Sequence, residues 1–392
     1  MSKKVRLSII GLGSRGEWAA VTAAKRQDVE IVALCDRIPA MAEWVRDHHG
    51  ITGAQVYDNF DTMLAEANCD GVMITTSDSH HAELVLPALA AGKYVFCEKP
   101  LEITLNKCRA IIEADDRAGG KVFVGHNLRY APLYETVKKH VDAGAIGRVL
   151  TIQADEFYSN GKTYFRRWNR LRSQGGGLWI TKACHDLDLL AWFAGGTPLE
   201  VYAADARTQF VPRPEAAKQC RFCKVADTCI DRARSPREST PLRQINEKNG
   251  GIPWDLCLYN SDSDTLDHGA VTIRFDNDVV ATYTLNVVTG LEDRRLRISG
   301  TEGTIDGHLA GDTISLCRRD NQQVTEYPLE VDRAAEHGGA DNWVVESFVR
   351  FVQGDSAPRT RPREAALAVC LGLAATRSAD THAVARMSDF DI

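Results

Sequence analysis

A glycine-rich turn near the N-terminus constrains the fold more than any other feature of this chain. The apolar run 5–10 predicts a strand, the hexad Gly-Leu-Gly-Ser-Arg-Gly at 11–16 follows it, and the Ala-rich stretch 17–26 predicts a helix. Strand, glycine turn and helix in this order are typical of dinucleotide-binding folds, where glycines let the backbone approach a pyrophosphate at a helix N-terminus. The alternative is a similar turn in a flavodoxin-like domain that binds no nucleotide.

The acidic residue after the next predicted strand indicates which cofactor fits. The strand 30–35 ends at Asp36, where a carboxylate suits the ribose hydroxyls of NAD and repels a 2′-phosphate. Arg37 stands beside it and could accommodate NADP. We therefore predict NAD and leave NADP open.

The first 126 residues alternate between strand and helix patterns. This alternation predicts a doubly wound parallel sheet, a Rossmann domain over residues 1–126. Its later strands are expected at 72–75, 94–97 and 122–125, with helices at 81–91 and 106–118. The carboxyl ends of these strands carry polar side chains, and ligands bind at that edge of open α/β sheets.

The pattern changes after residue 127. Alternating polar and apolar residues predict a second domain, 127–392, with a mainly antiparallel open sheet and helices. Strands are expected at 149–156, 201–208, 270–275, 279–288, 295–299 and 314–317, and helices at 133–143, 182–193, 343–352 and 362–375. The polar stretch at about 211–265 is expected to be an insertion in this α+β domain.

Composition narrows the class of protein. A chain of 392 residues is long enough for two domains, and a net charge of −6 gives no general attraction to nucleic acid or to an anionic membrane. No apolar run approaches 18 residues, and no secretory leader is recognisable at the start. We expect a cytoplasmic protein that binds neither nucleic acid nor membrane.

Short motifs along nearly the whole chain, in a characteristic order and spacing, resemble those of the glucose-fructose oxidoreductase and inositol 2-dehydrogenase superfamily, called Gfo/Idh/MocA. They are found at 11–16, 35–37, 76–81, 91–93, 98–100, 125–130, 144–147, 175–178, 185–188, 300–303 and 337–341. The resemblance implies a two-domain NAD(P)-dependent enzyme that acts on sugars, cyclitols or related polyols, with the nicotinamide over the open face of the C-terminal sheet. It also implies a homodimer or homotetramer.

The glycine turn, the strand ends and the resemblance together give a set of expected cofactor-binding residues. These are Gly11, Leu12, Gly13, Ser14, Arg15, Gly16, Asp36, Arg37, Thr75, Thr76, Ser77, His81, Glu98, Lys99 and Asn127.

Lys99, Lys182 and His185 are the expected catalytic residues. Oxidation of a secondary alcohol needs a group that removes the hydroxyl proton and stabilises the alkoxide, and a lysine with a pKa lowered by burial and neighbouring charge can do so. The alternative for Lys99 is an exposed lysine paired with Glu98. Histidine side chains in general exchange a proton near neutral pH, and His185 follows Lys182 by three residues, so that both would share one face of the helix 182–193. A packing or capping histidine is its alternative.

Two features depart from typical dehydrogenases of the superfamily. Typical dehydrogenases of the superfamily have an aspartate four residues before the histidine that matches His185, whereas this chain has Thr181 at that position. The second departure is a basic, aromatic segment at 162–170, which precedes the glycines at 175–177. Its arginines would suit an anionic sugar. The alternatives are that they are only solvated or that they hold the pyrophosphate of the cofactor. The expected substrate-binding residues are Arg129, Tyr130, Tyr158, Arg166, Arg167, Trp168, Thr181, Lys182 and His185.

The eleven cysteines fall into two groups. Seven lie in apolar runs and are expected to be buried, reduced thiols: Cys35, Cys69, Cys97, Cys108, Cys184, Cys317 and Cys370. The other four, Cys220, Cys223, Cys229 and Cys257, lie in the insertion and could form a structural zinc site. An iron-sulfur cluster and free thiols are the alternatives.

Two reactions fit these residues. The first is NAD-dependent removal of a hydride from a ring hydroxyl of a sugar or cyclitol, with anionic sugars among the candidates. The second is an NAD-dependent glycoside hydrolase, in which the substrate is transiently oxidised at C3, undergoes elimination and hydration, and is reduced again. The first reaction is the leading hypothesis, although the substitution at Thr181, the extra Lys182 and the arginines favour the second modestly.

Overall fold

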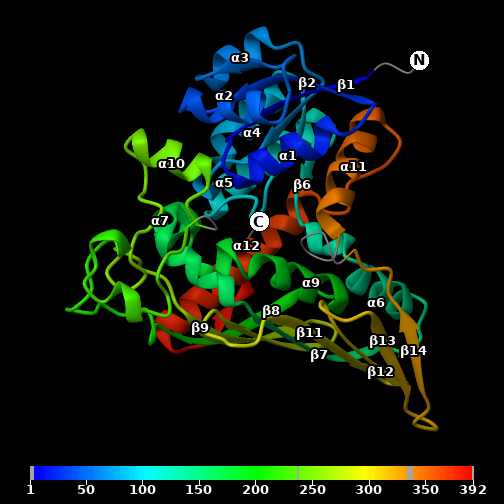
Figure 1. Cartoon of the computed structure of the whole chain (residues 1–392). Coiled ribbons are helices and arrows are strands. Elements are labelled where there is room, and N and C mark those ends of the chain that lie inside the picture. Colours follow the sequence, from blue (N-terminus) through cyan, green and yellow to red (C-terminus); the bar gives the residue numbers. More distant parts are fainter. Residues whose placement is uncertain (1–3, 236–237, 333–338, 391–392) are drawn as a thin grey trace.

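The computed structural model describes residues 4–235, 238–332 and 339–390, and comprises two sheets with helices packed between and around them (Figure 1). The first sheet lies in the N-terminal part of the chain, and the second forms an open layer at the opposite end of the molecule.

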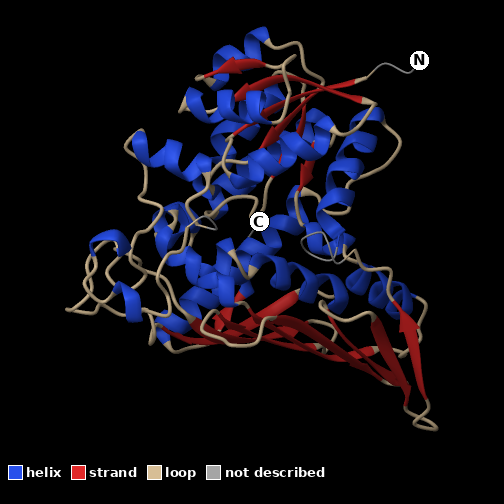
Figure 2. Ribbon diagram, in the orientation of Figure 1, coloured by secondary structure: helices blue, strands red, loops and turns tan. Residues whose placement is uncertain are grey.

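The N-terminal sheet is the parallel sheet that the alternating pattern predicts. Its strand order is β3-β2-β1-β4-β5-β6, and every pair is parallel. Figure 2 shows helices on both of its faces. The strands are β1 (Val5–Ile10), β2 (Val29–Cys35), β3 (Gln55–Tyr57), β4 (Gly71–Ile74), β5 (Tyr94–Cys97) and β6 (Val122–Val124). The helices are α1 (Ser14–Ala24), α2 (Pro39–His48), α3 (Phe60–Glu66), α4 (His81–Ala90) and α5 (Leu105–Ala118). The Rossmann prediction is confirmed.

The C-terminal sheet has the order β14-β13-β12-β11-β7-β10-β9-β8-β15. All its pairs are antiparallel except β7 with β10. The strands are β7 (Val149–Phe157), β8 (Pro198–Ala206), β9 (His268–Phe275), β10 (Val280–Asn286), β11 (Asp293–Gly300), β12 (Gly303–His308), β13 (Thr313–Arg318), β14 (Val324–Pro328) and β15 (Ala385–Arg386). Buried and exposed residues alternate strictly along β9, so one face is packed and the other is open. The mainly antiparallel open sheet is confirmed.

The remaining helices are α6 (Pro132–Asp142), α7 (Arg172–Gly175), α8 (Leu178–Thr181), α9 (Cys184–Ala194), α10 (Pro241–Lys248), α11 (Ala340–Gln353) and α12 (Pro362–Thr381). α9 and α12 cover the packed face of the second sheet, and α12 also contacts α5 and β6 of the first. α11 packs on the first sheet, where the Phe348 ring lies 5.6 Å from Phe96 and 5.8 Å from Phe123. α12 therefore joins the two sheets into one structure.

Three local features differ from expectation or add to it. The expected helix 182–193 begins at Cys184, because Leu178–Thr181 forms a separate short helix and the chain turns at Lys182. Cys317 is half-buried, whereas the other six cysteines of its group are buried as predicted. Within the described ranges, none of the helices has the length and hydropathy needed to span a lipid bilayer.

Candidate active site

The glycine turn leaves space at the N-terminus of α1. Gly11 has a φ of +90°, which favours glycine, and a Cβ on Gly16 would lie 2.1 Å from the Gly11 carbonyl oxygen. A Cβ on Gly13, the N-cap of α1, would meet no protein atom within 4 Å. The turn thus keeps free space beside unpaired helix amides, which is what a pyrophosphate needs.

Asp36 closes the other side of this turn. Its carboxylate accepts hydrogen bonds from the Leu12 amide at 2.7 Å and the Ile38 amide at 2.9 Å. It is held at the end of β2, beside the glycines, where the ribose of a dinucleotide lies in this fold. Arg37 is exposed. The residues present fit NAD.

The polar residues after β4 support the turn. The Thr75 hydroxyl donates to the carbonyl oxygens of Ile10 and Gly11, both at 2.9 Å, while Ser77 contacts His80 at 3.3 Å. The buried His81 ring lies 2.8 Å from the Pro100 carbonyl oxygen through Nδ1 and 3.4 Å from the Thr76 carbonyl oxygen through Nε2. His81 therefore fixes the strand-end loops, although it was expected to bind the cofactor.

Arg15 links α1 to the ends of β5 and α11. Its Nε donates to Glu98 at 2.7 Å, and its guanidinium lies 3.3 Å from Asp341. Asn127 donates to the same Asp341 carboxylate at 2.6 Å. These four side chains form a bridge beneath the expected cofactor site, and Asp341 is a member that the sequence did not single out.

Lys99 lies where the first sheet meets the C-terminal helices. Its Nζ donates to the Thr181 carbonyl oxygen at 2.8 Å, and the residue is half-buried. Burial lowers its pKa, but the neighbouring Cys184, Tyr164, Asp78 and Glu98 together outweigh burial and raise it above the ordinary value. The expectation that burial and neighbouring charge together lower this pKa was wrong, because the neighbouring groups favour the charged ammonium more strongly than burial disfavours it.

Asp78 brings a carboxyl group to the side chain at position 181, where the sequence has threonine in place of aspartate. It is buried, lies close enough to attract Lys99, and its carboxylate is hydrogen-bonded to the Thr181 side chain. Burial raises the pKa of Asp78 well above the usual range, and Lys99 and Thr181 act against this shift. Sequence reasoning missed Asp78, although it follows β4 at the same edge as Thr75 and Thr76.

His185, the second expected proton carrier, lies near the start of α9. The centroid of its ring is 6.2 Å from that of His126, and both residues are buried. His126 Nδ1 lies 3.6 Å from Asp188, and burial lowers the pKa of His126 to about 4. Asp188 in turn accepts two hydrogen bonds from Arg129, at 2.8 and 2.7 Å. Arg129, an expected substrate residue, thus holds α9 in place.

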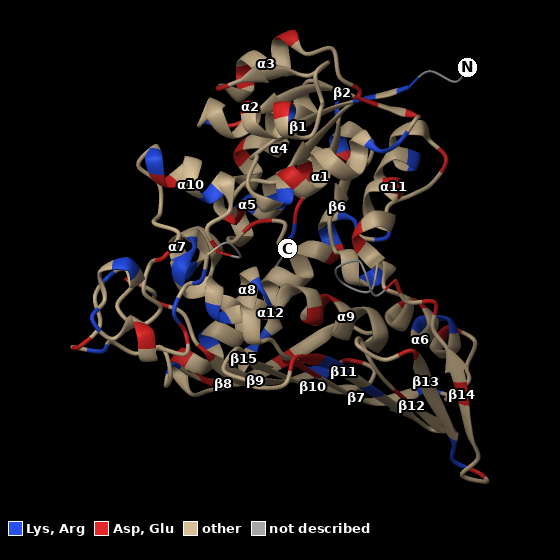
Figure 3. Ribbon diagram, in the orientation of Figure 1, with Lys and Arg blue, Asp and Glu red and all other residues tan. Residues whose placement is uncertain are grey.

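Lys182 belongs to a buried network of charges between α9 and the second sheet. Its Nζ is 2.8 Å from Glu156, whose carboxylate also lies 2.6 Å from Arg294. Asp186 lies 3.6 Å from Arg294 and accepts a 3.0 Å hydrogen bond from the Tyr283 hydroxyl. Figure 3 shows acidic and basic segments side by side where α9 lies over the strands near β11. Because Lys182 precedes α9, it does not share a helical face with His185 as expected.

The basic, aromatic segment has several different environments. Arg166 is buried, forms an ion pair with Glu238 and donates to the Asp231 carbonyl oxygen at 2.8 Å. Tyr158, which precedes this segment, has its ring 3.8 Å from Lys182 Nζ. Arg167 is exposed, and Trp168 is half-buried.

Five of the expected substrate residues are buried outside the basic segment: Arg129, Tyr130, Thr181, Lys182 and His185. Tyr130 is buried under the Arg359 guanidinium, 4.4 Å away, and Thr181 is buried beside Lys99. Only Arg167, Tyr158 and Trp168 of the expected substrate residues retain appreciable exposure.

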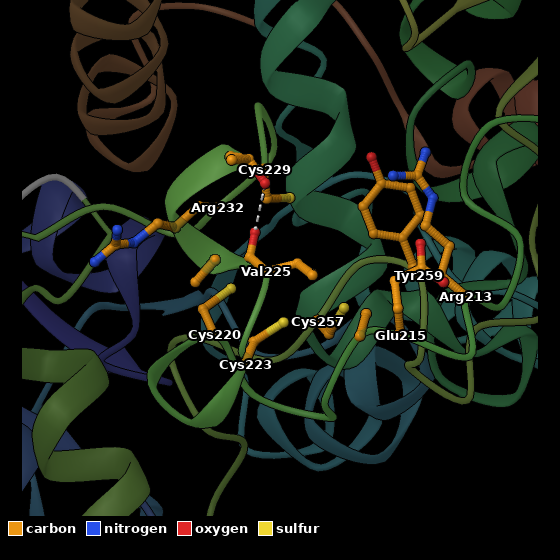
Figure 4. Close-up of a pocket in the computed structure, with 12 residues that line it drawn as sticks. Arg213, Glu215, Cys220, Cys223, Val225, Cys229, Arg232, Cys257 and Tyr259 are labelled. Carbon is orange, nitrogen blue, oxygen red and sulfur yellow. Dashed lines mark hydrogen bonds between the residues drawn. The ribbon is translucent and has the colours of Figure 1, made fainter.

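The four cysteines of the insertion line one cavity (Figure 4). Within the described ranges, no group of three or more His, Cys, Asp or Glu side chains is arranged to hold a metal ion. A preformed zinc centre is thus not seen in that part of the chain, and zinc binding stays a prediction.

Two family models match the chain. The oxidoreductase family with an NAD-binding Rossmann fold matches residues 5–126, and the GFO/IDH/MocA C-terminal domain matches residues 134–306.

The chain is also similar to named relatives. It is 28% identical over 318 residues to YteT of Bacillus subtilis, an oxidoreductase by name, covering 74% of each chain. It is 31% identical over 204 residues to inositol 2-dehydrogenase of Rhizobium meliloti, covering 52% of this chain and 58% of that one. The chain thus spans little more than half the length of this inositol dehydrogenase.

Solved structures share the fold over nearly the whole length. An oxidoreductase from Agrobacterium radiobacter in complex with NAD+, L-tartaric acid and magnesium has a TM-score of 0.73 at 18% identity, covering 99% of this chain and 100% of that one. Scyllo-inositol dehydrogenase from Lactobacillus casei with NAD(H) and scyllo-inositol has a TM-score of 0.72 at 19% identity, covering 98% and 100%. At such identities the likeness shows the fold alone. With both domain models matched in order, this chain belongs to the Gfo/Idh/MocA family of oxidoreductases.

Proposed function

We propose that this protein oxidises a ring hydroxyl of a sugar or cyclitol, with NAD as the hydride acceptor. One observation carries the proposal: Lys99 Nζ is held 2.8 Å from the Thr181 carbonyl oxygen at the carboxyl edge of the NAD-binding sheet, beside the buried Asp78. Relatives named inositol 2-dehydrogenase support a cyclitol or a similar polyol as substrate.

The cofactor-binding residues follow from the turn geometry. Gly13 and the amides at the start of α1 receive the pyrophosphate, and Asp36 binds the ribose hydroxyls. Bound NAD supplies the carbon that accepts the hydride. The comparisons give no support to the glycoside hydrolase alternative, so we do not propose it.

Lys99 acts as a cation in this proposal. Because its neighbours raise its pKa, the ammonium keeps its proton at neutral pH and stabilises the negative charge that grows on the substrate oxygen. A lysine that keeps its proton cannot be the base, so we assign removal of the hydroxyl proton to His185. Lys99 therefore positions and polarises the hydroxyl, and His185 takes its proton.

Asp78 and Lys182 have supporting roles. Asp78 holds the Thr181 side chain and attracts Lys99, so it does from the first domain what an aspartate at position 181 would do from the second. Lys182 forms an ion pair with Glu156 and contacts the face of the Tyr158 ring, so we assign it a structural role in the site. Arg166 is paired with Glu238 of the insertion, so Arg167 is the arginine that we propose for recognition of an anionic group on the substrate.

A cofactor-coupled assay tests the proposal. The protein is incubated with NAD or NADP and a panel of cyclitols, sugars and aryl glycosides, while NADH absorbance and aglycone release are followed together. We expect NADH in a one-to-one ratio with oxidised product, and a preference for NAD over NADP. Aglycone release that needs only catalytic NAD, without accumulation of NADH, would overturn the proposal.

A further inference from the structure

A cavity inside the insertion is lined by cysteines, and it lies outside the candidate active site. Its volume is about 210 Å³, and Cys220, Cys223, Cys229 and Cys257 all line it. Figure 4 shows Cys220, Cys223 and Cys257 gathered at one side of the cavity, with Cys229 on another side in this view.

The backbone holds two distant segments together at this cavity. The Cys220 amide donates to the Asp255 carbonyl oxygen, and the Cys257 amide donates to the Lys218 carbonyl oxygen, both at 2.9 Å. These two hydrogen bonds flank an isolated antiparallel β-bridge between Gln219 and Leu256, so Cys220 and Cys257 lie on neighbouring chain segments. A tight turn, in which the Cys223 amide donates to the Cys220 carbonyl oxygen at 3.1 Å, adds the third thiol.

Backbone amides already point at two of the sulfur atoms. The Ala217 amide lies 3.5 Å from Cys223 Sγ, and the Ala233 amide lies 3.4 Å from Cys220 Sγ. Such bonds stabilise negative charge on sulfur, and thiolates are the form of cysteine that binds metal. The guanidinium-bearing residues Arg213 and Arg232 also line the cavity, which favours an anionic thiolate cluster.

The insertion has little else to stabilise it. Few of its side chains are buried and apolar, and Phe222 and Ile230 are 72% and 77% exposed. A small, loop-rich segment of this kind gains most from a metal that crosslinks it. Four sulfur ligands would fill the tetrahedral shell of zinc, so the metal would be structural.

We propose that these four cysteines bind one Zn²⁺ ion. The thiols line a shared cavity without forming a preformed centre within the described ranges, so binding requires their side chains to rotate inward to the roughly 2.3 Å of a zinc–sulfur bond. The bound ion also anchors the loop that carries Cys229 and the Asp231 carbonyl oxygen, which accepts from Arg166.

Metal analysis of the purified full-length protein tests this proposal. We expect about one zinc per chain by elemental analysis, and loss of that zinc in Cys223→Ser and Cys257→Ser. Cys317→Ser, a half-buried cysteine outside the cavity, is the matched control and should keep the metal.

A second measurement does not depend on the folding of the variants. Wild-type protein stripped with a chelator is titrated with Co²⁺, and we expect the absorption of a tetrahedral cobalt thiolate centre, saturating at about one ion per chain. Iron with acid-labile sulfide in place of zinc, a disulfide between any of the four cysteines, or four free thiols that take up neither ion would overturn it. Since metal content is read without substrate, this result is independent of the proposed reaction.

Discussion

Lys99 brings a positive charge to the point where the first sheet meets α8. We predict that Lys99→Met lowers kcat by about two or more orders of magnitude, because the alkoxide loses its stabilising cation. NAD affinity, measured by fluorescence titration, should change little. Lys121→Met is the matched control, since Lys121 donates to the Gly92 carbonyl oxygen instead of Thr181. Full activity in Lys99→Met would contradict the assigned role.

Asp78 acts on activity through Lys99. Because Asp78 is one of the groups that raise the pKa of Lys99, Asp78→Asn should lower that pKa. We predict that the alkaline limb of the kcat/KM profile shifts to lower pH in this variant, while the protein still binds NAD. A uniform loss of activity without a shift of the limb would assign Asp78 a purely structural role.

His126 is expected to make the free energy of unfolding depend on pH in the acidic range. Its pKa is about 4 in the folded protein, compared with about 6.5 unfolded, so the unfolded chain binds the proton first as pH falls. The stability contribution is complete above pH 6.5 and is lost between pH 6.5 and 4, by about 3 kcal/mol. Denaturant unfolding of wild type and His126→Asn at both pH values measures this. An equal loss in the two proteins would contradict it.

Two glycines in the turn before α1 are expected to have different roles, one in stability and the other in cofactor binding. Gly16→Ala should destabilise the protein by about 1–3 kcal/mol, because the new Cβ would collide with the Gly11 carbonyl oxygen. Gly13→Ala should leave stability nearly unchanged and weaken NAD binding, because its Cβ enters the free space beside the α1 amides. Thermal unfolding and NAD titration of both variants check this pair, and the reverse pattern would contradict it.

Local signals explain what the sequence could predict at the scale of elements. The glycine turn, Asp36 and the strand-end position of Lys99 are recognisable because residues adjacent in the chain determine them. The start of α9 was not predictable, because the apolar residues of α8 continue into it and the turn at Lys182 carries neither glycine nor proline.

Contacts between distant parts of the chain explain what could not be predicted for the whole molecule. Asp78 meets Thr181 only once the two sheets are packed together, and Asp341 meets Arg15 only once α11 packs on the first sheet. Packing also decides whether a side chain faces the substrate or another element. Arg129 and Arg166 were expected to bind substrate, but they are buried and paired with Asp188 and Glu238. Assembly into a homodimer or homotetramer through the open sheet face stays a prediction.

Transfer of deuterium from substrate to cofactor distinguishes net oxidation of the substrate from a reaction that returns the hydride to it. A cyclitol or sugar that is oxidised in the panel assay is prepared with deuterium on its carbinol carbon and incubated with the protein and excess NAD. We expect the deuterium to appear in the reduced cofactor, in a one-to-one ratio with the ketone product. Deuterium that returns to the product without net reduction of NAD would contradict it, since the hydride would then not remain on the cofactor.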